Sequence, residues 1–141
     1  MTRRKKVSKN EFRYNYNTKH MNYVFEEDGK YYHSIGLTTK SKTSKKKNMP
    51  LFENPKRGSD KQSFVRNGII TNKKKNYSAT SDRRFRFSDI DFPNVKSKIR
   101  KYKSSRKKWH KKNKHLSTGD SYPQLQMQLL DVCWYYYMQN K

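Results

Sequence analysis

The chain has one cysteine, five isolated glycines and few acidic residues, and each shortage excludes a class of protein. Cys133 alone cannot form an intramolecular disulfide or a cysteine-based zinc site. Neither Gly-x-Gly-x-x-Gly nor a Walker A sequence is present, so ATP-driven chemistry is not expected. A Gly-x-Ser-x-Gly turn of a serine hydrolase is also missing. We therefore expect no cofactor.

Long apolar runs are missing too. The cations Arg3, Arg4, Lys5 and Lys6 are not followed by the apolar stretch of a secretory signal, and no stretch is long enough to span a bilayer. Binding to anionic lipid usually needs an amphipathic helix or a lipid anchor beside the charge, so we expect no membrane partner. The lone cysteine fits a reducing compartment. These features predict a cytoplasmic protein.

Basic residues are abundant instead. The 141-residue chain has 35 Lys+Arg against 11 Asp+Glu, which gives a formal net charge of +24. Residues 92–116 contain eleven of these cations and no acidic residue. Cations at this density repel one another unless an anion neutralises them, and nucleic acid presents phosphates at a matching density. The predicted partner is nucleic acid, with RNA favoured over DNA, although phosphate spacing alone does not separate the two. Such a partner predicts that the protein is associated with a nucleoid or a ribonucleoprotein particle.

The apolar residues are few but clustered, which predicts a small core with basic margins. They make up 30% of the chain, and aromatic residues alone make up 14%. We predict a small α+β fold: an antiparallel, aromatic-rich sheet of three to five strands, a basic amphipathic helix and an apolar C-terminal helix. In this prediction residues 1–13 are a basic arm, residues 14–116 form the nucleic-acid-binding domain, and residues 117–141 form the C-terminal helix.

Strands are predicted where aromatic residues alternate, as in Phe12-x-Tyr14-x-Tyr16 and Tyr23-x-Phe25. Asp28-Gly29 is typical of a two-residue turn, so residues 21–25 should pair with residues 30–38 and bring Tyr23 and Phe25 near Tyr32 and Ile35. Residues 40–48 are basic and lack periodicity, which predicts a mobile loop. Asn67-Gly68, inside the apolar stretch 63–71, suits either a hairpin turn or a bulged strand.

A helix is predicted over residues 93–114, with Ser88 or Asp91 as its N-cap. Phe92, Val95, Ile99 and Tyr102 form one apolar stripe, which should dock on the sheet. The basic residues on the other faces lack acidic neighbours, so they are candidates for phosphate contacts. Trp109, framed by lysines, is the candidate for stacking on unpaired bases. The candidate nucleic-acid-binding residues are Lys96, Lys98, Arg100, Lys101, Lys103, Arg106, Lys107, Lys108, Trp109, Lys111 and Lys112.

Further aromatic residues lie among cations in the predicted sheet and can either stack on bases or fill the core. They are Tyr14, Tyr16, Tyr23, Tyr31 and Tyr32. Residues 121–141 differ from the rest because only Asp131 and Lys141 are charged. Two apolar stripes on one helix predict that it covers the core, a second copy of the chain or another protein.

Histidines provide the only candidates for catalysis. The predicted hairpin could bring His20 and His33 together beside Thr38, with nearby Lys or Arg as oxyanion partners. A general base, a general acid and an oxyanion partner are what metal-free RNA cleavage requires. Surface imidazoles without a catalytic role are the alternative. His110 and His115 are five residues apart, on different faces of a helix, so we expect no metal site.

The order of segments in residues 30–78 resembles that of the PemK/MazF-like mRNA interferase toxins. The matching segments are IGLTT (35–39), MPLF (49–52) and SFVRNGIIT (63–71). This resemblance implies that Thr38 or Thr39 matches the active-site threonine of that family. The Gly-x-x-x-Arg-Pro-type segment that carries the family's catalytic arginine has no counterpart, and the basic helix is foreign to the family.

Three functions follow from these observations. The first is binding of nucleic acid, as an accessory or regulatory protein of a mobile element or nucleoprotein complex. The second is a metal-independent endoribonuclease that uses His20, His33 and Thr38. The third is an inhibitor or assembly protein of an RNA-guided or ribosomal machine, with residues 121–141 as the surface for a protein partner or for self-association.

Overall fold

The computed structural model of the chain describes residues 8–113, 134, 137 and 138. The chain divides into two compact units, Met1–Asn94 and Val95–Lys141. The first unit contains every strand among the described residues, and the second contains most of the long helix α1 (Phe92–Lys112). The boundary lies within α1, whereas the sequence prediction placed the end of the domain at residue 116. Among the described residues, no helix has the length and apolar character needed to cross a membrane.

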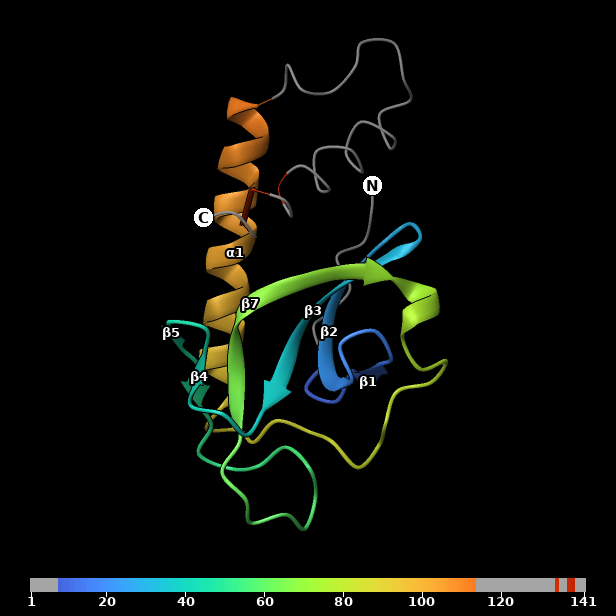
Figure 1. The fold of residues 1–141 in the computed structure, drawn as a ribbon, viewed down its shortest axis with the longest axis vertical. Helices are drawn as coiled ribbons and strands as arrows, with labels where there is room; N and C mark the ends of the chain where they lie inside the picture. Colours follow the sequence, from blue (N-terminus) through green and yellow to red (C-terminus); the bar gives the residue numbers. More distant parts are fainter. Residues whose placement is uncertain (1–7, 114–133, 135–136, 139–141) are drawn as a thin grey trace. The chain divides into compact units, whose positions relative to one another are not determined.

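The first unit is built on a five-stranded sheet with the order β1-β2-β3-β7-β6 (Figure 1). Its strands are β1 (Phe12–Asn15), β2 (His20–Asp28), β3 (Tyr31–Thr38), β7 (Phe64–Lys73) and β6 (Met49–Pro50). Every neighbouring pair is antiparallel. The sheet and the helix confirm the predicted α+β fold and the predicted strand number. β3, with six consecutive buried residues from His33 to Thr38, is the centre of this sheet.

The β2–β3 hairpin confirms the predicted pairing of Tyr23 with Ile35. Its turn is Gly29-Lys30, one residue later than predicted, because Asp28 still pairs with Tyr31. Gly29 has a φ of 56°, a left-handed conformation that glycine adopts without a steric cost. A register shift between Val24 and Glu26 leaves Phe25 without a paired residue on β3, and Tyr32 pairs with Glu27.

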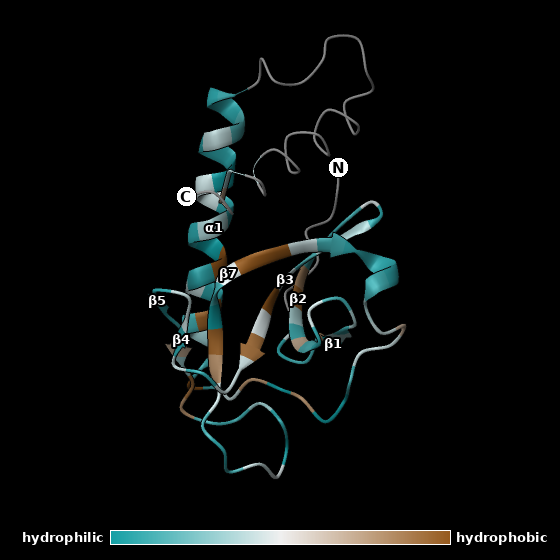
Figure 2. Ribbon diagram, viewed as in Figure 1, coloured by the Kyte–Doolittle hydropathy of each residue, from teal (hydrophilic) through white to brown (hydrophobic). Residues whose placement is uncertain are grey.

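Aromatic rings supply the core of the first unit. Phe12, which is fully buried, has its ring centroid 5.4 Å from that of Tyr23 and 4.8 Å from that of Phe87. Figure 2 shows that hydrophobic residues also run along β3 and β7. The backbone oxygen of Lys9 accepts a hydrogen bond from the Phe87 N–H (3.0 Å). Residues 8–13 therefore belong to the folded unit, and the predicted arm over residues 1–13 is wrong for these residues.

The predicted mobile loop over residues 40–48 is instead a small hairpin of β4 (Lys42–Thr43) and β5 (Lys46–Lys47). The buried side chain of Asn48 fixes it. Asn48 Nδ2 donates to the backbone oxygen of Lys40 (2.9 Å) and to Thr43 Oγ1 (2.7 Å), and Asn48 Oδ1 accepts from the Asn67 N–H (3.0 Å). Hydrogen bonds of one side-chain amide hold this hairpin together, and not a row of alternating apolar residues. The hairpin was therefore not visible as a periodic pattern in the sequence.

β7 settles the choice between a turn and a bulge at Asn67-Gly68. Ile69 pairs with Ile35 and Val65 pairs with Leu37, so three residues of β7 face Gly36 alone. The segment is therefore one bulged strand. A Cβ atom on Gly36 would lie 3.0 Å from Arg66 Cδ and 3.2 Å from Asn22 Oδ1, so the glycine allows the Arg66 side chain to cross β3 closely.

The helix α1 begins one residue before and ends two residues before the predicted bounds. Phe92, Val95 and Ile99 are buried and Tyr102 is half-buried, which confirms that this stripe is the covered one. The docking of the stripe on the sheet stays a prediction. Asp91 precedes the helix as expected, but its carboxylate serves another segment: it accepts hydrogen bonds from the Phe52 N–H (2.7 Å) and the Glu53 N–H (3.0 Å).

Candidate nucleic-acid interface

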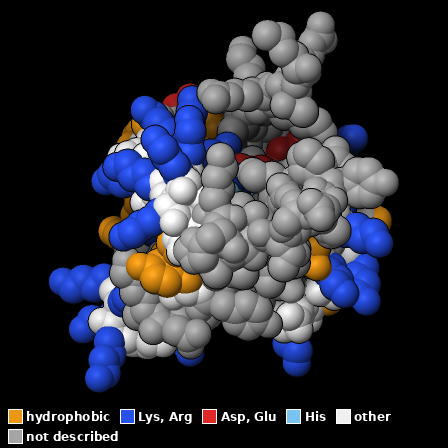
Figure 3. Space-filling model, turned by 90° about the horizontal axis from the view of Figure 1, so that it is seen from above, with side chains coloured by type: hydrophobic (Ala, Val, Ile, Leu, Met, Phe, Trp, Pro, Cys, Tyr) orange, Lys and Arg blue, Asp and Glu red, His pale blue; other side chains and the backbone are white. Residues whose placement is uncertain are grey.

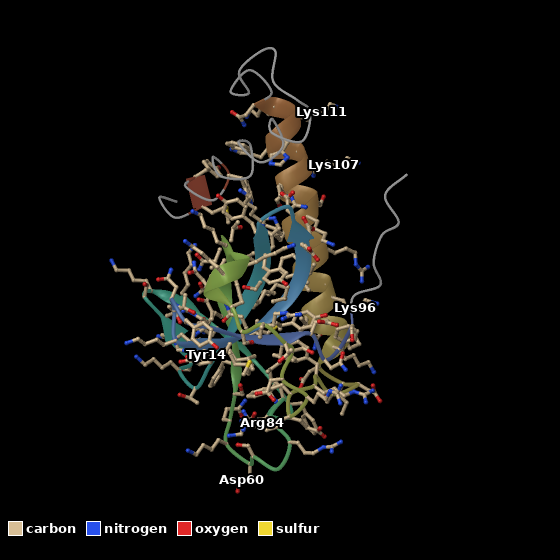
Figure 4. The ribbon with its side chains drawn as sticks, turned by 90° about the vertical axis from the view of Figure 1, so that its right-hand side faces the viewer. Tyr14, Asp60, Arg84, Lys96, Lys107 and Lys111 are labelled. Carbon is tan, nitrogen blue, oxygen red and sulfur yellow. The ribbon has the colours of Figure 1, made fainter. Side chains whose placement is uncertain are left out.

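The faces of α1 that are not buried carry cations. Figure 4 shows Lys96, Lys107 and Lys111 projecting at successive levels of this helix. Seven of the candidate side chains are exposed, and another three are half-buried. The exposed ones are Lys96, Arg100, Lys101, Lys107, Lys108, Lys111 and Lys112, and the half-buried ones are Lys98, Lys103 and Arg106. Burial lowers the pKa of Lys98, and the nearby charge of Lys101 lowers that pKa further.

No acidic residue is present in α1 to offset these charges. Several cations follow one another at a spacing of four, as Lys96 and Arg100 do, and like charges at this spacing destabilise a helix. One cation has an aromatic partner, because the Arg106 guanidinium lies over the Tyr102 ring at 5.4 Å from its centroid. The helix therefore gains stability from any anion that binds along its exposed faces.

Trp109 does not have the exposed position that the sequence suggested. It is half-buried, and its ring centroid lies 5.8 Å from that of the buried Trp134 and 6.0 Å from that of Tyr137. Lys108, one position before Trp109, lies on another face of the helix. The rest of the predicted C-terminal helix lies outside the described residues, so its role in binding a partner or a second copy stays a prediction.

The exposed aromatic residues of the first unit are Tyr16 and Phe52, at 60% and 72% exposure. Tyr16 was among the candidates for base stacking, but Tyr23, another candidate, is fully buried. Tyr23 Oη donates to the backbone oxygen of Ser8 (2.6 Å), and burial raises the pKa of this phenol. Phe52 was not singled out. The apolar run MPLF does not distinguish its members, and only the fold shows that Leu51 is buried while Phe52 is exposed.

Phe52 lines a cleft of about 1090 Å³ between residues 51–62 and residues 83–90. Backbone hydrogen bonds join the two walls: the Arg57 N–H donates to the oxygen of Arg84 (2.8 Å) and the Arg86 N–H donates to the oxygen of Pro55 (2.9 Å). Cations outnumber acids in the lining. They are Lys56, Arg57, Lys61, Arg83, Arg84 and Arg86, against Glu53, Asp60 and Asp89. Figure 4 places Arg84 and Asp60 in this part of the first unit.

Basic side chains also dominate the described surface in Figure 3, where Lys and Arg far outnumber Asp and Glu. Several acids of the first unit are already paired. Asp89 pairs with Lys9, and the Asp82 carboxylate accepts two hydrogen bonds from Arg84, at 3.0 and 2.7 Å. The hydrogen bonds from Arg84 hold the pKa of Asp82 below its ordinary value.

The structure does not bring the candidate catalytic residues His20 and His33 together. His20 pairs with Asn15, whereas His33 pairs with Glu26, six residues further along β2 or roughly 20 Å at the rise of a strand. His33 is buried, with Nδ1 2.7 Å from Thr71 Oγ1 and Nε2 3.8 Å from carboxylate oxygens of both Glu26 and Asp28. The expectation that both histidines serve one site is therefore wrong.

His20 has different neighbours. His20 begins β2 and Thr38 ends β3, so both lie at the same end of this pair of antiparallel strands. Burial lowers the pKa of His20, and the positive charges of Arg66 and Lys40 lower that pKa further. The buried Thr38 accepts a hydrogen bond at Oγ1 from the Lys40 N–H (3.2 Å). Within the described residues, no group of three or more His, Cys, Asp or Glu side chains could hold a metal ion.

Comparisons with protein-family models, with curated proteins and with solved structures find no match. The resemblance to the PemK/MazF-like toxins therefore stays a prediction. Its three segments do lie on β3, β6 and β7, which are neighbours in one sheet.

Proposed function

We propose that the chain binds nucleic acid, with RNA preferred, through the exposed cations of α1. One observation carries this proposal: seven exposed Lys and Arg side chains on a 21-residue helix that has no acidic residue. Such contacts to phosphates set affinity without reading sequence. This activity suits an accessory or regulatory protein of a nucleoprotein complex or a mobile element.

The dependence of affinity on salt tests this proposal. Each phosphate contact adds about 0.9 to the slope of log affinity against log salt for a duplex and about 0.7 for a single strand. Replacing Lys96, Lys107 and Lys111 with Gln should lower the slope by about 2 to 3. The matched control replaces three exposed lysines near β4 and β5, Lys42, Lys45 and Lys47, and should change the slope less. A slope near zero for the unmodified chain would contradict the proposal.

A second candidate function, metal-independent RNA cleavage, is favoured by the surroundings of His20. A neutral imidazole beside two cations can act as a general base, while Arg66 and Lys40 can stabilise a developing phosphorane charge. Incubation with labelled RNA in EDTA tests this function. Cleavage should disappear in His20→Gln and persist in His33→Gln, whose imidazole lies elsewhere. Intact RNA with retained binding would eliminate the enzyme.

A further inference from the structure

We propose that the cleft between residues 51–62 and 83–90 holds a short single-stranded segment of nucleic acid, with one base stacked on Phe52. This inference rests on the proposed function, because it assigns a second contact surface to the same polymer. It goes further in specifying that the segment in the cleft is unpaired. The second surface belongs wholly to the first unit and does not depend on α1 cations.

The position of Phe52 is the first support. Its side chain is 72% exposed although its backbone is held in place. The buried Asp91 carboxylate accepts hydrogen bonds from the backbone N–H groups of Phe52 and Glu53. It also accepts a hydrogen bond from Ser88 Oγ (3.0 Å). An aromatic ring on a fixed backbone, open to water, is a platform that a base can cover with little loss of conformational freedom.

A second apolar side chain lies in the same cleft. Ile90 is 58% exposed and belongs to the opposite wall from Phe52. The walls are fixed before any ligand binds, since Lys56 and Phe85 form a β-bridge and Asn54 Nδ2 donates to the backbone oxygen of Lys61 (2.9 Å). The cleft therefore combines apolar surface with a preformed shape, as base-binding sites do.

The charge of the cleft supports a polyanion as its occupant. Among the residues that the structure describes, no acidic side chain forms an ion pair with Arg57, Lys61 or Arg83. All three side chains line the cleft. The acidic residue Asp89 is already paired with Lys9, from outside the lining. The unpaired guanidinium and ammonium groups can bind the phosphates on either side of a stacked base.

The size of the cleft and its aromatic residue favour an unpaired strand over a duplex. A volume of about 1090 Å³ is close to the upper end of small-molecule sites, which are roughly 300–1,000 Å³. Only a few nucleotide units fit such a space. Stacking on Phe52 also requires a base whose face is free, which a duplex does not provide. RNA and DNA single strands share this chemistry, so the experiment compares both.

The experiment measures fluorescence anisotropy of labelled 12-nucleotide RNA and DNA, each as a single strand and as a duplex, with the full-length chain. Phe52→Ala should weaken single-strand binding about tenfold, and Phe52→Trp should retain it. Duplex binding should change less than twofold in both variants. Phe52→Leu, which keeps an apolar side chain at this position but removes the aromatic face, is the matched control and should weaken single-strand binding about as much as Phe52→Ala does.

Two double variants distinguish a localised binding site in the cleft from non-specific attraction to the overall positive charge. Arg57→Ser with Lys61→Ser should weaken single-strand binding more than Lys45→Ser with Lys47→Ser, which removes the same charge elsewhere. Equal losses in the two pairs, or unchanged binding in Phe52→Ala, would overturn the inference. Competition by a poly-glutamate peptide as strong as that by RNA would also overturn it, because the cleft would then bind acidic chains in general.

The failure of the inference differs from the failure of the proposed function. If the unmodified chain binds neither single strands nor duplexes, the proposed function fails and the inference fails with it. If binding is lost in the α1 lysine variant but kept in the cleft variants, the inference alone fails. Thermal unfolding of each variant, followed by circular dichroism, confirms that the exposed substitutions leave the fold intact.

Discussion

Cations in the sheet unit and cations in α1 have different surroundings. The sheet unit contains acidic residues that bind particular cations, as Glu27 binds Lys74 and Asp82 binds Arg84. Helix α1 has no acidic residue of its own, and one of its cations, Arg106, lies over the Tyr102 ring. The net charge of +24 is therefore distributed unevenly. Acidic residues of the sheet unit balance part of it, whereas α1 contributes many cations and no acidic residue.

The two regions also differ in what stabilises them. The sheet unit has an aromatic core and buried polar contacts, such as Asn22 Nδ2 donating to Ser34 Oγ (3.0 Å), which in turn lies 2.7 Å from Tyr77 Oη. Cations are incorporated there too, since Arg13 lies over the Tyr32 ring at 5.5 Å from its centroid. The aromatic core of the sheet unit can accommodate nearby cations without losing its packing. A helix such as α1 gains little stability from its own sequence, because most helical stability in proteins comes from packing against other elements.

The largest expected effect tests the core of the sheet unit. Phe12→Ala should lower the free energy of unfolding by about 3–5 kcal/mol, because it leaves a cavity among Tyr23, Phe85 and Phe87. Chemical denaturation measures this loss. Tyr16→Ala, at an exposed position, should change stability by less than about 0.5 kcal/mol. Similar losses for both variants would contradict the assigned core.

A smaller loss is expected for Asp91→Ala, which tests the connection between the start of α1 and residues 52–53. The backbone N–H groups of Phe52 and Glu53 would lose their buried acceptor, at a cost of about 2–3 kcal/mol. Asp91→Asn keeps one acceptor oxygen and should recover part of the loss. Equilibrium urea unfolding distinguishes the two variants, and equal stability of Asp91→Ala and the unmodified chain would exclude the anchoring role.

Removing a positive charge from α1 should raise the free energy of unfolding and not lower it. Lys107→Gln removes repulsion from Lys111 and should stabilise the free protein by about 0.2–0.5 kcal/mol at low ionic strength, with a smaller gain in high salt. Arg84→Gln, which removes the partner of Asp82 in the sheet unit, should not stabilise the protein under either condition. Differential scanning calorimetry at two salt concentrations measures both. A gain in Arg84→Gln equal to that in Lys107→Gln would remove the distinction between the two regions.

The smallest expected effect concerns His20. Its pKa in the folded protein lies below 6.5, so the unfolded chain binds the proton more readily. The contribution of His20 to the free energy of unfolding therefore falls as the pH drops from about 6.5 to the pKa of His20 in the folded protein. Below that folded-state pKa the loss stays constant. Titration of the imidazole by NMR measures the folded pKa. Inorganic phosphate bound beside Arg66 and Lys40 should raise it, and a pKa at or above 6.5 in phosphate-free buffer would contradict the electrostatic environment.

Local patterns predicted much of this fold because each depends on near neighbours in the chain. The Tyr23–Phe25 alternation, the glycine turn and the apolar stripe from Phe92 to Ile99 all became the expected elements. The hairpin at 42–47 was missed because one buried amide, Asn48, holds it. The register shift that leaves Phe25 without a paired residue was not predicted, since register depends on the whole sheet.

The candidate site was predicted less completely. Dense cations on a helix are visible in the sequence because helical geometry fixes which faces they occupy. The separation of His20 and His33 was not visible in the sequence, because it depends on how β2 pairs with its two neighbouring strands. The exposure of Phe52 and the covering of Trp109 depend on segments distant in the chain, Asp91 in one case and Trp134 in the other.

The charge of this protein, its high content of aromatic residues and its acid-free helix follow from the sequence alone, because composition and short-range periodicity are properties of the chain itself. Only the tertiary structure decided which aromatic residues face water and which cations share a cleft. The cleft arises where residues 51–62 and 83–90 meet through backbone hydrogen bonds, and contacts between such distant segments leave no periodic signal in the sequence.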